Sequence, residues 1–453
     1  MFHRFALVVA LICAATRALA HAGEQGFVLL LPTQLYIIGG GLSVLATVLL
    51  ISVLPQRMAV SLFRPTTIKR WRLARAKSGV SCIGFAVMVG LVFIGLTGPH
   101  DPNHNALPLA VWAMFWFGFV TLQGLMGDLW RWINPWTGPW LAIRRLGVRP
   151  IARLPRWLGY WPASLSFLAF AAVLLAHPSP SDPDALAAMV ACYWVFHFIG
   201  MVVFGPAWLR RAEGLGVLLR CYASLSVAGQ SAGRLRLGVP GWKIVTGPRP
   251  DTSLAVFIVI LLAVGSFDGL NETFWWMARI GINPLEFPGR SAVVAQNLAG
   301  LGLAVPMLVA AYAMAIWLGV RLIGQGARFA AAFCALAPAI LPIAFGYHFG
   351  HYMPGFLVQI QYVAGVIADA FGMGPVHVTT GFFNTYATVR AIWLLQAGSV
   401  VVGHILAIIL SHVLALSLFG THRKAAISQL PLAIFMVGYT VFGLWLLASP
   451  RGV

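Results

Sequence analysis

Four histidines lie in two apolar segments of the C-terminal third of the chain. His348 and His351 belong to the run LPIAFGYHFGHYM, and His404 and His412 belong to the run GHILAIILSH. A polar side chain inside a membrane helix usually faces the bundle interior or a watery cavity, so each is a candidate for function. Imidazole nitrogens bind transition metals and transfer protons. The alternative is that neutral histidines hydrogen-bond to neighbouring helices and hold the bundle together.

The spacing of these histidines restricts which of them can bind one ion. Three residues turn a helix by about 300°, so the rings of His348 and His351 are about 60° apart and one turn displaced, which permits a shared ion. His404 and His412 lie about 12 Å apart along a helix axis, too far to bind one small ion together. Either of them can still bind an ion together with a histidine of the other segment, His348 or His351.

The motif SFDGLNETFWW places an acid, Asp268, at the outer end of the sixth expected membrane helix, just before Gly269, where the helix should end. The helix dipole disfavours an acid at a helix C-terminus, so a compensating partner is expected. That partner is either a bound cation or the side chain of Arg279 or Arg290.

The first twenty residues have the pattern of a secretory signal peptide: Arg4, an apolar run over 5–15, and the small-residue cleavage site ending at Ala20. Cleavage makes His21 the new N-terminal residue. A terminal histidine offers its α-amine and its ring nitrogen to the same metal ion, the arrangement called a histidine brace in some copper proteins. The alternative is that His21 follows the cleavage site by chance.

Other catalytic signatures are absent from the sequence. It contains no G-x-S-x-G, P-loop, dinucleotide-binding or His-Glu-x-x-His motif. The five cysteines form no C-x-x-C pair, so they do not indicate a disulfide framework. The chemistry that remains is metal-activated water, in which the ion lowers the pKa of its water and polarises the bond to be cleaved.

The elements that position these residues are membrane helices. With 60% hydrophobic and 9% charged residues and a mean hydropathy of +0.86, the 453-residue chain lies outside the soluble globular range. We expect an all-α polytopic membrane helix bundle with a single domain over residues 21–453. Apolar runs of about 20 residues predict ten spanning helices. They lie near 33–55, 79–97, 108–127, 157–176, 184–205, 253–270, 291–320, 329–353, 386–417 and 430–448.

The distribution of charge predicts how these helices are oriented. Five loops hold 24 of the 30 lysine and arginine residues and are expected in the cytoplasm, which places the mature N-terminus on the outer, periplasmic side of a bacterial inner membrane. The net charge of +19 is thus explained by topology, and no nucleic-acid partner is expected. These loops are 56–78, 128–156, 206–252, 321–328 and 418–429.

Three segments have more specific expectations. Pro338 and Pro342 remove backbone donors and predict a kink just before His348. Segment 354–375 carries polar residues and is expected to be a re-entrant or outer-surface helix over the bundle, because a further crossing would oppose the charge bias. The inner loop 206–252 is amphipathic and is expected to lie along the membrane surface.

An ordered set of motifs resembles the bacterial inner-membrane proteins of the fenitrothion hydrolase family. The set comprises HAGEQG after the leader, SFDGLNETFWW, LPIAFGYHFGHYM followed by QIQ, and AIWLLQAGSVVVGHILAIILSHVLAL. These motifs span most of the mature chain in the family's order. They match the family's histidines at His21, His351, His404 and His412 and its acid at Asp268, whereas the position of His348 is commonly apolar in the family.

The resemblance implies hydrolysis of a phosphotriester or thiophosphate ester with loss of an aryl group, and a second membrane subunit as partner. A small lipophilic substrate of this kind partitions into the lipid bilayer and can enter between helices. On this hypothesis His351 and His404, together with His21, bind a divalent transition metal, zinc or copper. Asp268 orients a ligand or accepts a proton, and His348 is an auxiliary base.

Two other functions fit the same residues. The first is a periplasm-facing protein that handles copper or another metal, for which a terminal His21 and outer-face histidines are suited. The second is a transporter or assembly subunit whose histidines are structural or carry protons. The hydrolase hypothesis requires His351 and His404 for activity but not for folding.

Overall fold

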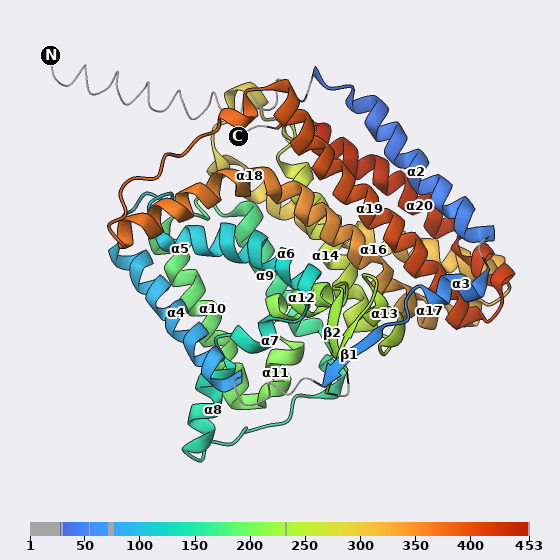
Figure 1. Ribbon diagram of the computed structural model, residues 1–453, viewed down its shortest axis with the longest axis horizontal. Coiled ribbons are helices and arrows are strands. Elements are labelled where there is room, and N and C mark those ends of the chain that lie inside the picture. The colour runs from blue at the N-terminus through green and yellow to red at the C-terminus, as the bar shows by residue number, and fades with distance from the viewer. Residues whose placement is uncertain (1–27, 29, 54, 71–76, 232, 452–453) are drawn as a thin grey trace.

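The computed structural model describes residues 28, 30–53, 55–70, 77–231 and 233–451, which form a bundle of long helices with little strand (Figure 1). Nine helical segments in this described part are long and apolar enough to span a membrane. The all-α polytopic bundle is therefore confirmed. The expected signal peptide and His21 lie outside the described residues.

The spanning segments agree closely with the apolar runs of the sequence. They are α2 (Thr33–Val53), α4 (Lys77–Thr97), α5 (Ala106–Pro108) with η2 (Leu109–Phe119) and α6 (Val120–Met126), α10 (Pro183–Phe204), α14 (Thr252–Asn271), η5 (Arg290–Val293) with α16 (Val294–Leu322), η6 (Gly326–Arg328) with α17 (Phe329–Leu336), η7 (Ala337–Ile340) and α18 (Leu341–Ala370), α19 (Tyr386–Phe419), and α20 (His422–Ala448).

Shorter elements connect these segments. The helical ones are α3 (Gln56–Ser61), α7 (Trp130–Ile133), α8 (Thr137–Arg145), η3 (Arg156–Leu158), α9 (Trp161–Ala176), α11 (Pro206–Arg211), α12 (Gly214–Ala223), α13 (Trp242–Thr246), α15 (Phe274–Arg279), η4 (Pro284–Glu286) and η8 (Gly381–Phe383). The strands are β1 (Thr66–Arg70), β2 (Ala228–Ser231) and β3 (Arg234–Leu237).

The tenth expected spanning helix, 157–176, is the shorter helix α9. Its 16 residues extend for about 24 Å, less than the roughly 30 Å of a hydrocarbon core. One of its faces, which carries Ala163, Phe167 and Ala171, is fully buried. In length α9 therefore falls short of the other nine segments, and it contributes mainly to the core of the bundle.

The predicted kink before His348 is confirmed. A 3₁₀ segment, η7, interrupts the helix at Ala337–Ile340 and contains Pro338, so α17 and α18 do not form one regular helix. The expected break before 354–375 is absent, because α18 continues through Pro354 to Ala370. The ring of Phe356 packs 4.5 Å from that of Phe117 on η2, which supports the helix beyond the proline.

Two expected loops are also different in the structure. Residues 422–429 of the expected inner loop 418–429 form the first turns of α20, with Thr421 as the N-cap. In the 206–252 loop, α12 is almost wholly buried and does not lie along a surface, because its leucines face α6 and α9. The side chain of Glu213 caps α12 by accepting from Gly216 N at 2.7 Å, and burial raises the pKa of this carboxyl group.

A small antiparallel sheet joins two loops that the charge pattern places on one side. The strand order is β1-β3-β2, with Thr66 opposite Leu237 and Ala228 opposite the same Leu237. Because β1 belongs to 56–78 and the other strands belong to 206–252, both basic loops lie at the same end of the bundle. The grouping of these loops agrees with the expected topology.

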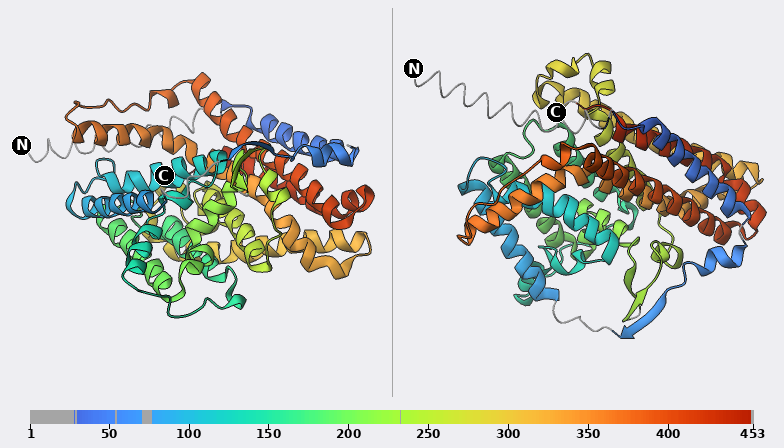
Figure 2. Two further views of the ribbon diagram at one scale, coloured as in Figure 1. Left: turned by 60° about the horizontal axis from the view of Figure 1, so that its bottom comes forward. Right: turned by 45° about the horizontal axis from the view of Figure 1, so that its top comes forward.

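The helices that carry the candidate site pack at short distances. α18 and α19 approach closely because glycines replace side chains between them: a Cβ at Gly346 would lie 2.4 Å from Ser399 O, and one at Gly403 would lie 2.5 Å from Pro342 O. α14 runs through the centre and is the most buried spanning helix. Figure 2 shows α2, in blue, lying beside α19 and α20, in red.

Candidate metal centre

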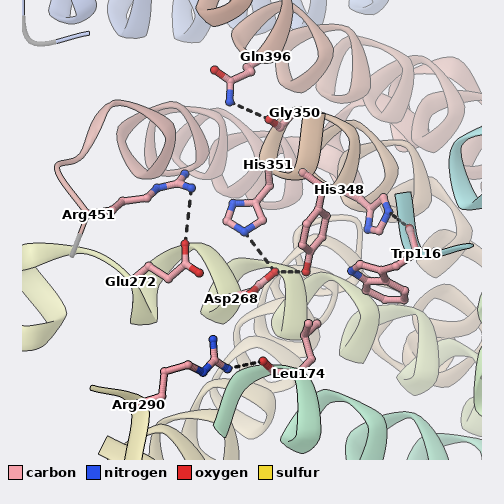
Figure 3. A network of polar contacts seen from close by, with 11 residues as sticks. Trp116, Leu174, Asp268, Glu272, Arg290, His348, Gly350, His351, Gln396 and Arg451 are labelled. Carbon is pink, nitrogen blue, oxygen red and sulfur yellow. Dashed lines mark hydrogen bonds and ion pairs between the residues drawn. The ribbon is translucent and has the colours of Figure 1, made fainter. Parts of the chain in front are cut away.

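The two central helices bring one acid and one histidine into contact. Asp268 lies in the last turn of α14, and its Oδ2 is 3.3 Å from Nε2 of His351 on α18 (Figure 3). The two side chains are only 8% and 5% exposed. The hydroxyl of the next residue, Tyr352, donates a hydrogen bond to the same carboxylate oxygen. These two contacts compensate an acid that the helix dipole disfavours.

A second carboxylate completes the cluster. Glu272 directly follows α14, and because it is four residues after Asp268 both acids lie on the same side of the helix. One ligand atom of each of Asp268, Glu272 and His351 lies within 4.8 Å of the others. Sequence reasoning did not select Glu272, although the i, i+4 spacing of the two acids in DGLNE was a usable signal.

The C-terminal residues hold Glu272 in place. Phe274 N donates to Pro450 O at 2.9 Å, and Thr273 forms a β-bridge with Arg451. The guanidinium of Arg451 then lies 3.6 Å from the Glu272 carboxylate, as Nη1 to Oε2. The end of the chain therefore places one positive charge beside the second carboxylate.

These three residues fit a divalent metal ion. Two ligands of one tetrahedral ion with bonds of about 2.0 Å are about 3.3 Å apart, which matches the separation of His351 Nε2 and Asp268 Oδ2. His351 Nδ1, the other ring nitrogen, is buried without a hydrogen-bond partner among the described residues, and a bound water would supply one. Two carboxylate oxygens and one imidazole nitrogen form a donor set that zinc accepts.

The cluster lies on the wall of a cavity of about 410 Å³. The cavity is formed where η2, α18 and α19 meet the ends of α14 and α20, and Glu272, His351 and Tyr352 line it directly. Six of its other lining residues are aromatic, so an apolar group fits beside the polar cluster. The aromatic lining residues are Trp112, Trp116, Phe117, Phe356, Phe383 and Trp393.

Three of these aromatic side chains come from a π-helical segment, η2. Its 11 residues, Leu109–Phe119, have wider turns than an α-helix, and they place Trp112, Trp116 and Phe117 on the cavity. π-Helical turns occur frequently at functional sites. The apolar run of the sequence predicted a helix here but carried no signal for this geometry.

The expected arginine partners of Asp268 do not contact it. Arg279 lies over the ring of Trp275, with its guanidinium carbon 5.0 Å from the ring centre. Arg290 lines the cavity, but its Nε donates to His177 O at 3.1 Å and its Nη2 to Leu174 O at 2.6 Å. The salt-bridge alternative is therefore wrong for both residues, because backbone carbonyls and an aromatic ring hold them.

His348 is not part of the cluster. Its Nε2 donates a 2.8 Å hydrogen bond to the carbonyl oxygen of Trp116, and its ring packs edge-on against the Trp116 ring at 4.9 Å. His348 is buried and is absent from the cavity lining. The structure therefore does not bring His348 to the same ligand cluster as His351, because the 60° rotation between them turns His348 toward η2.

His404 and His412 lie apart from the Asp268 cluster and from each other along α19. His404 Nδ1 donates to Val400 O at 2.8 Å, whereas its Nε2 is buried without a partner among the described residues. His412 lines a separate cavity of about 120 Å³, and its ring lies 5.2 Å from that of His422. Of the expected ligands within the described chain, the structure therefore brings only His351 to a metal-ligand cluster.

Comparisons with protein-family models, with curated proteins and with solved structures found no match to the chain. The functional argument therefore depends on the geometry of the site.

Proposed function

We propose that the protein is a membrane-embedded, metal-dependent hydrolase of lipophilic phosphate esters, with aryl phosphotriesters and thiophosphate esters as the first compounds to assay. The observation that carries the proposal is the convergence of Asp268, Glu272 and His351 on the wall of an aromatic cavity. The cavity volume of about 410 Å³ lies within the range of small-molecule sites. The resemblance noted in the sequence points to the same reaction.

The metal that this donor set favours is zinc. Carboxylate oxygens and imidazole suit zinc better than copper(I), which prefers sulfur ligands. Asp268, Glu272 and His351 would hold the ion. A divalent ion at this position would lower the pKa of a bound water and polarise the phosphoryl oxygen.

The surrounding residues have defined roles in this reaction. The water oxygen forms a bond to phosphorus while the bond from phosphorus to the aryl oxygen breaks. Asp268 accepts the proton of the water, and this proton ends on the departing aryl oxide. The Tyr352 hydroxyl holds the Asp268 carboxylate in one orientation through its hydrogen bond. Aromatic side chains of the cavity bind the aryl group and exclude bulk water.

Metal analysis of the purified protein in detergent tests this proposal. We expect near-stoichiometric zinc in the wild-type protein, and its loss in His351→Ala and Glu272→Gln. His404→Ala is the matched control, because it removes a buried histidine outside the cluster. Hydrolysis of an aryl phosphotriester should follow the metal content. No bound metal after zinc supplementation, or metal retained in both ligand variants, contradicts the proposal.

The proposal includes a cellular location and a partner. The charge distribution supports a bacterial inner membrane with the mature N-terminus and the cavity on the periplasmic side. Reporter enzymes fused after Gly147 and after Met373 should report cytoplasm and periplasm, respectively. The proposal also includes the second membrane subunit that the resemblance implies. Co-purification from native membranes would identify this subunit.

A second candidate function, proton-coupled transport, is favoured by one observation. His404 and His412 are buried in α19 and each has an Nε2 without a partner among the described residues. Histidines of this kind carry protons in transporters. If this function is correct, the protein in liposomes should collapse an imposed pH gradient, and His404→Ala should abolish the collapse.

A further inference from the structure

Two arginines lie beside the candidate metal centre. Arg451 and Arg290 both line the 410 Å³ cavity, and in Figure 3 they lie on opposite sides of the Asp268 and Glu272 carboxylates. Arg451 contacts Glu272 at 3.6 Å. Arg290 contacts neither acid, and its contacts with other described residues are to backbone carbonyls of Leu174 and His177.

The hydrogen bonds of Arg290 leave one of its guanidinium nitrogens, Nη1, available for a ligand. Nε and Nη2 each donate to a carbonyl oxygen near the end of α9, which fixes the plane of the group. Nη1 has no hydrogen bond within the described part of the chain, so its N–H groups remain for a ligand in the cavity. A fixed, planar guanidinium is well suited to bind phosphate or carboxylate oxygens.

The charges around the cavity indicate the charge of that ligand. Among the described residues at the cavity and its metal cluster, Asp268 and Glu272 are negative and Arg290 and Arg451 are positive, so the four side chains sum to zero. A bound divalent ion raises the sum by two positive charges. A partly enclosed site in a membrane protein holds uncompensated charge at high cost. An anionic ligand removes part of this cost, whereas a neutral phosphotriester removes none.

We propose that the preferred ligand of this cavity is an amphipathic anion, a phosphodiester with one large apolar group, and that Arg290 binds its charged phosphoryl oxygen. This inference rests on the proposed hydrolase function and specifies its substrate class. The apolar group occupies the aromatic part of the cavity formed by Trp112, Trp116 and Phe356. Neutral aryl phosphotriesters are then secondary substrates that use the same metal and the same aromatic walls.

The first test measures binding without turnover. Inorganic phosphate is titrated into the zinc-loaded protein in detergent by calorimetry, for the wild type, Arg290→Gln and Arg290→Lys. We expect Arg290→Gln to weaken binding about 10- to 100-fold, as for loss of a hydrogen bond between charged groups, and Arg290→Lys to recover part of the loss. Arg279→Gln is the matched control, because Arg279 stacks on Trp275 and does not line the cavity.

The second test measures selectivity with two esters that share an aryl leaving group. One is an alkyl aryl phosphodiester with a single negative charge, and the other is the dialkyl aryl phosphotriester. We expect a higher kcat/KM for the diester in the wild type. Arg290→Gln should lower kcat/KM at least tenfold for the diester and less than threefold for the triester. An equal loss of kcat/KM for both esters would mean that Arg290 only stabilises the loop between α9 and α10. That result overturns the inference.

The two tests separate this inference from the proposed function. If the protein hydrolyses neither ester but binds phosphate through Arg290, the hydrolase proposal fails and the anion site stands. If zinc-loaded wild-type protein does not bind phosphate, or if Arg290→Gln binds it as tightly as the wild type, the anion site is refuted whatever the turnover. A melting temperature of Arg290→Gln equal to that of Arg279→Gln shows that the fold is intact.

Discussion

Replacement of Asp268 by alanine removes the carboxylate that the Tyr352 hydroxyl and the His351 imidazole both contact. The alanine leaves two buried polar groups without this partner, and each such group costs about 1–3 kcal/mol. The sum is about 2–6 kcal/mol of unfolding free energy. Water from the adjacent cavity can hydrate both groups in part, so we expect the lower half of this range, about 2–4 kcal/mol.

Replacement of Asp268 by asparagine separates the hydrogen bond from the charge. The amide oxygen still accepts from Tyr352, so we expect this variant to lose less than half as much stability as alanine. A double-mutant cycle of Asp268→Ala with Tyr352→Phe should give a coupling energy of about 1.5–3 kcal/mol, the range for hydrogen bonds to charged groups. The same cycle with Tyr362→Phe is the control, because Tyr362 lies on α18 and has no contact with Asp268.

The assay is reversible unfolding of the protein by sodium dodecyl sulfate added to mild detergent micelles, followed by tryptophan fluorescence. Unfolding free energies are compared for the wild type, the four single variants and the two double variants. A coupling energy between Asp268 and Tyr352 below about 0.5 kcal/mol, the usual additivity of independent sites, would refute the reasoning. Equal losses for alanine and asparagine would also contradict it.

Three further predictions follow from other parts of the structure. Gly346→Ala should destabilise the protein by about 1–3 kcal/mol because its Cβ would meet Ser399 O, whereas Gly398→Ala, with free space around it, should be neutral or stabilising in the same unfolding assay. Zinc at 100 times its Kd should stabilise the wild type by about 2.7 kcal/mol, and Glu272→Gln should lose this effect on the melting curve. Burial lowers the pKa of Lys243 to about 8, below the 10.5 of an exposed lysine. The unfolded chain therefore binds more protons between these values, so stability should rise with pH over this window, and Lys243→Met should abolish the rise in melting temperature.

Hydropathy alone was sufficient to predict the membrane helices, because a helix that spans lipid must be apolar over about 20 residues. Nine of the ten predicted segments coincide with long helices of the structure. The kink before α18 was also predictable, because Pro338 lacks a backbone donor. The continuation of α18 through Pro354 was not, because tertiary contacts such as Phe117 with Phe356 decide whether a helix tolerates a proline.

The candidate site was predicted only in part. Asp268 and His351 were selected from their types and from their positions in apolar helices, and the structure places them in contact. His404, His412 and His348 were selected on the same grounds and lie elsewhere. A one-dimensional pattern specifies the face of a helix that a residue occupies, but it does not specify which neighbouring helix that face meets.

The sequence by itself determined that the chain spans a membrane many times, that its basic loops lie at one end, and that a few histidines and acids are the candidates for chemistry. These properties depend on composition and local spacing. The tertiary structure decided that Glu272 and Tyr352 join Asp268 and His351, and that Arg290 faces the same cavity. The physical reason is that these contacts join α14, α18 and the segment at the start of α16, whose relative rotation and spacing are set by side-chain packing throughout the bundle.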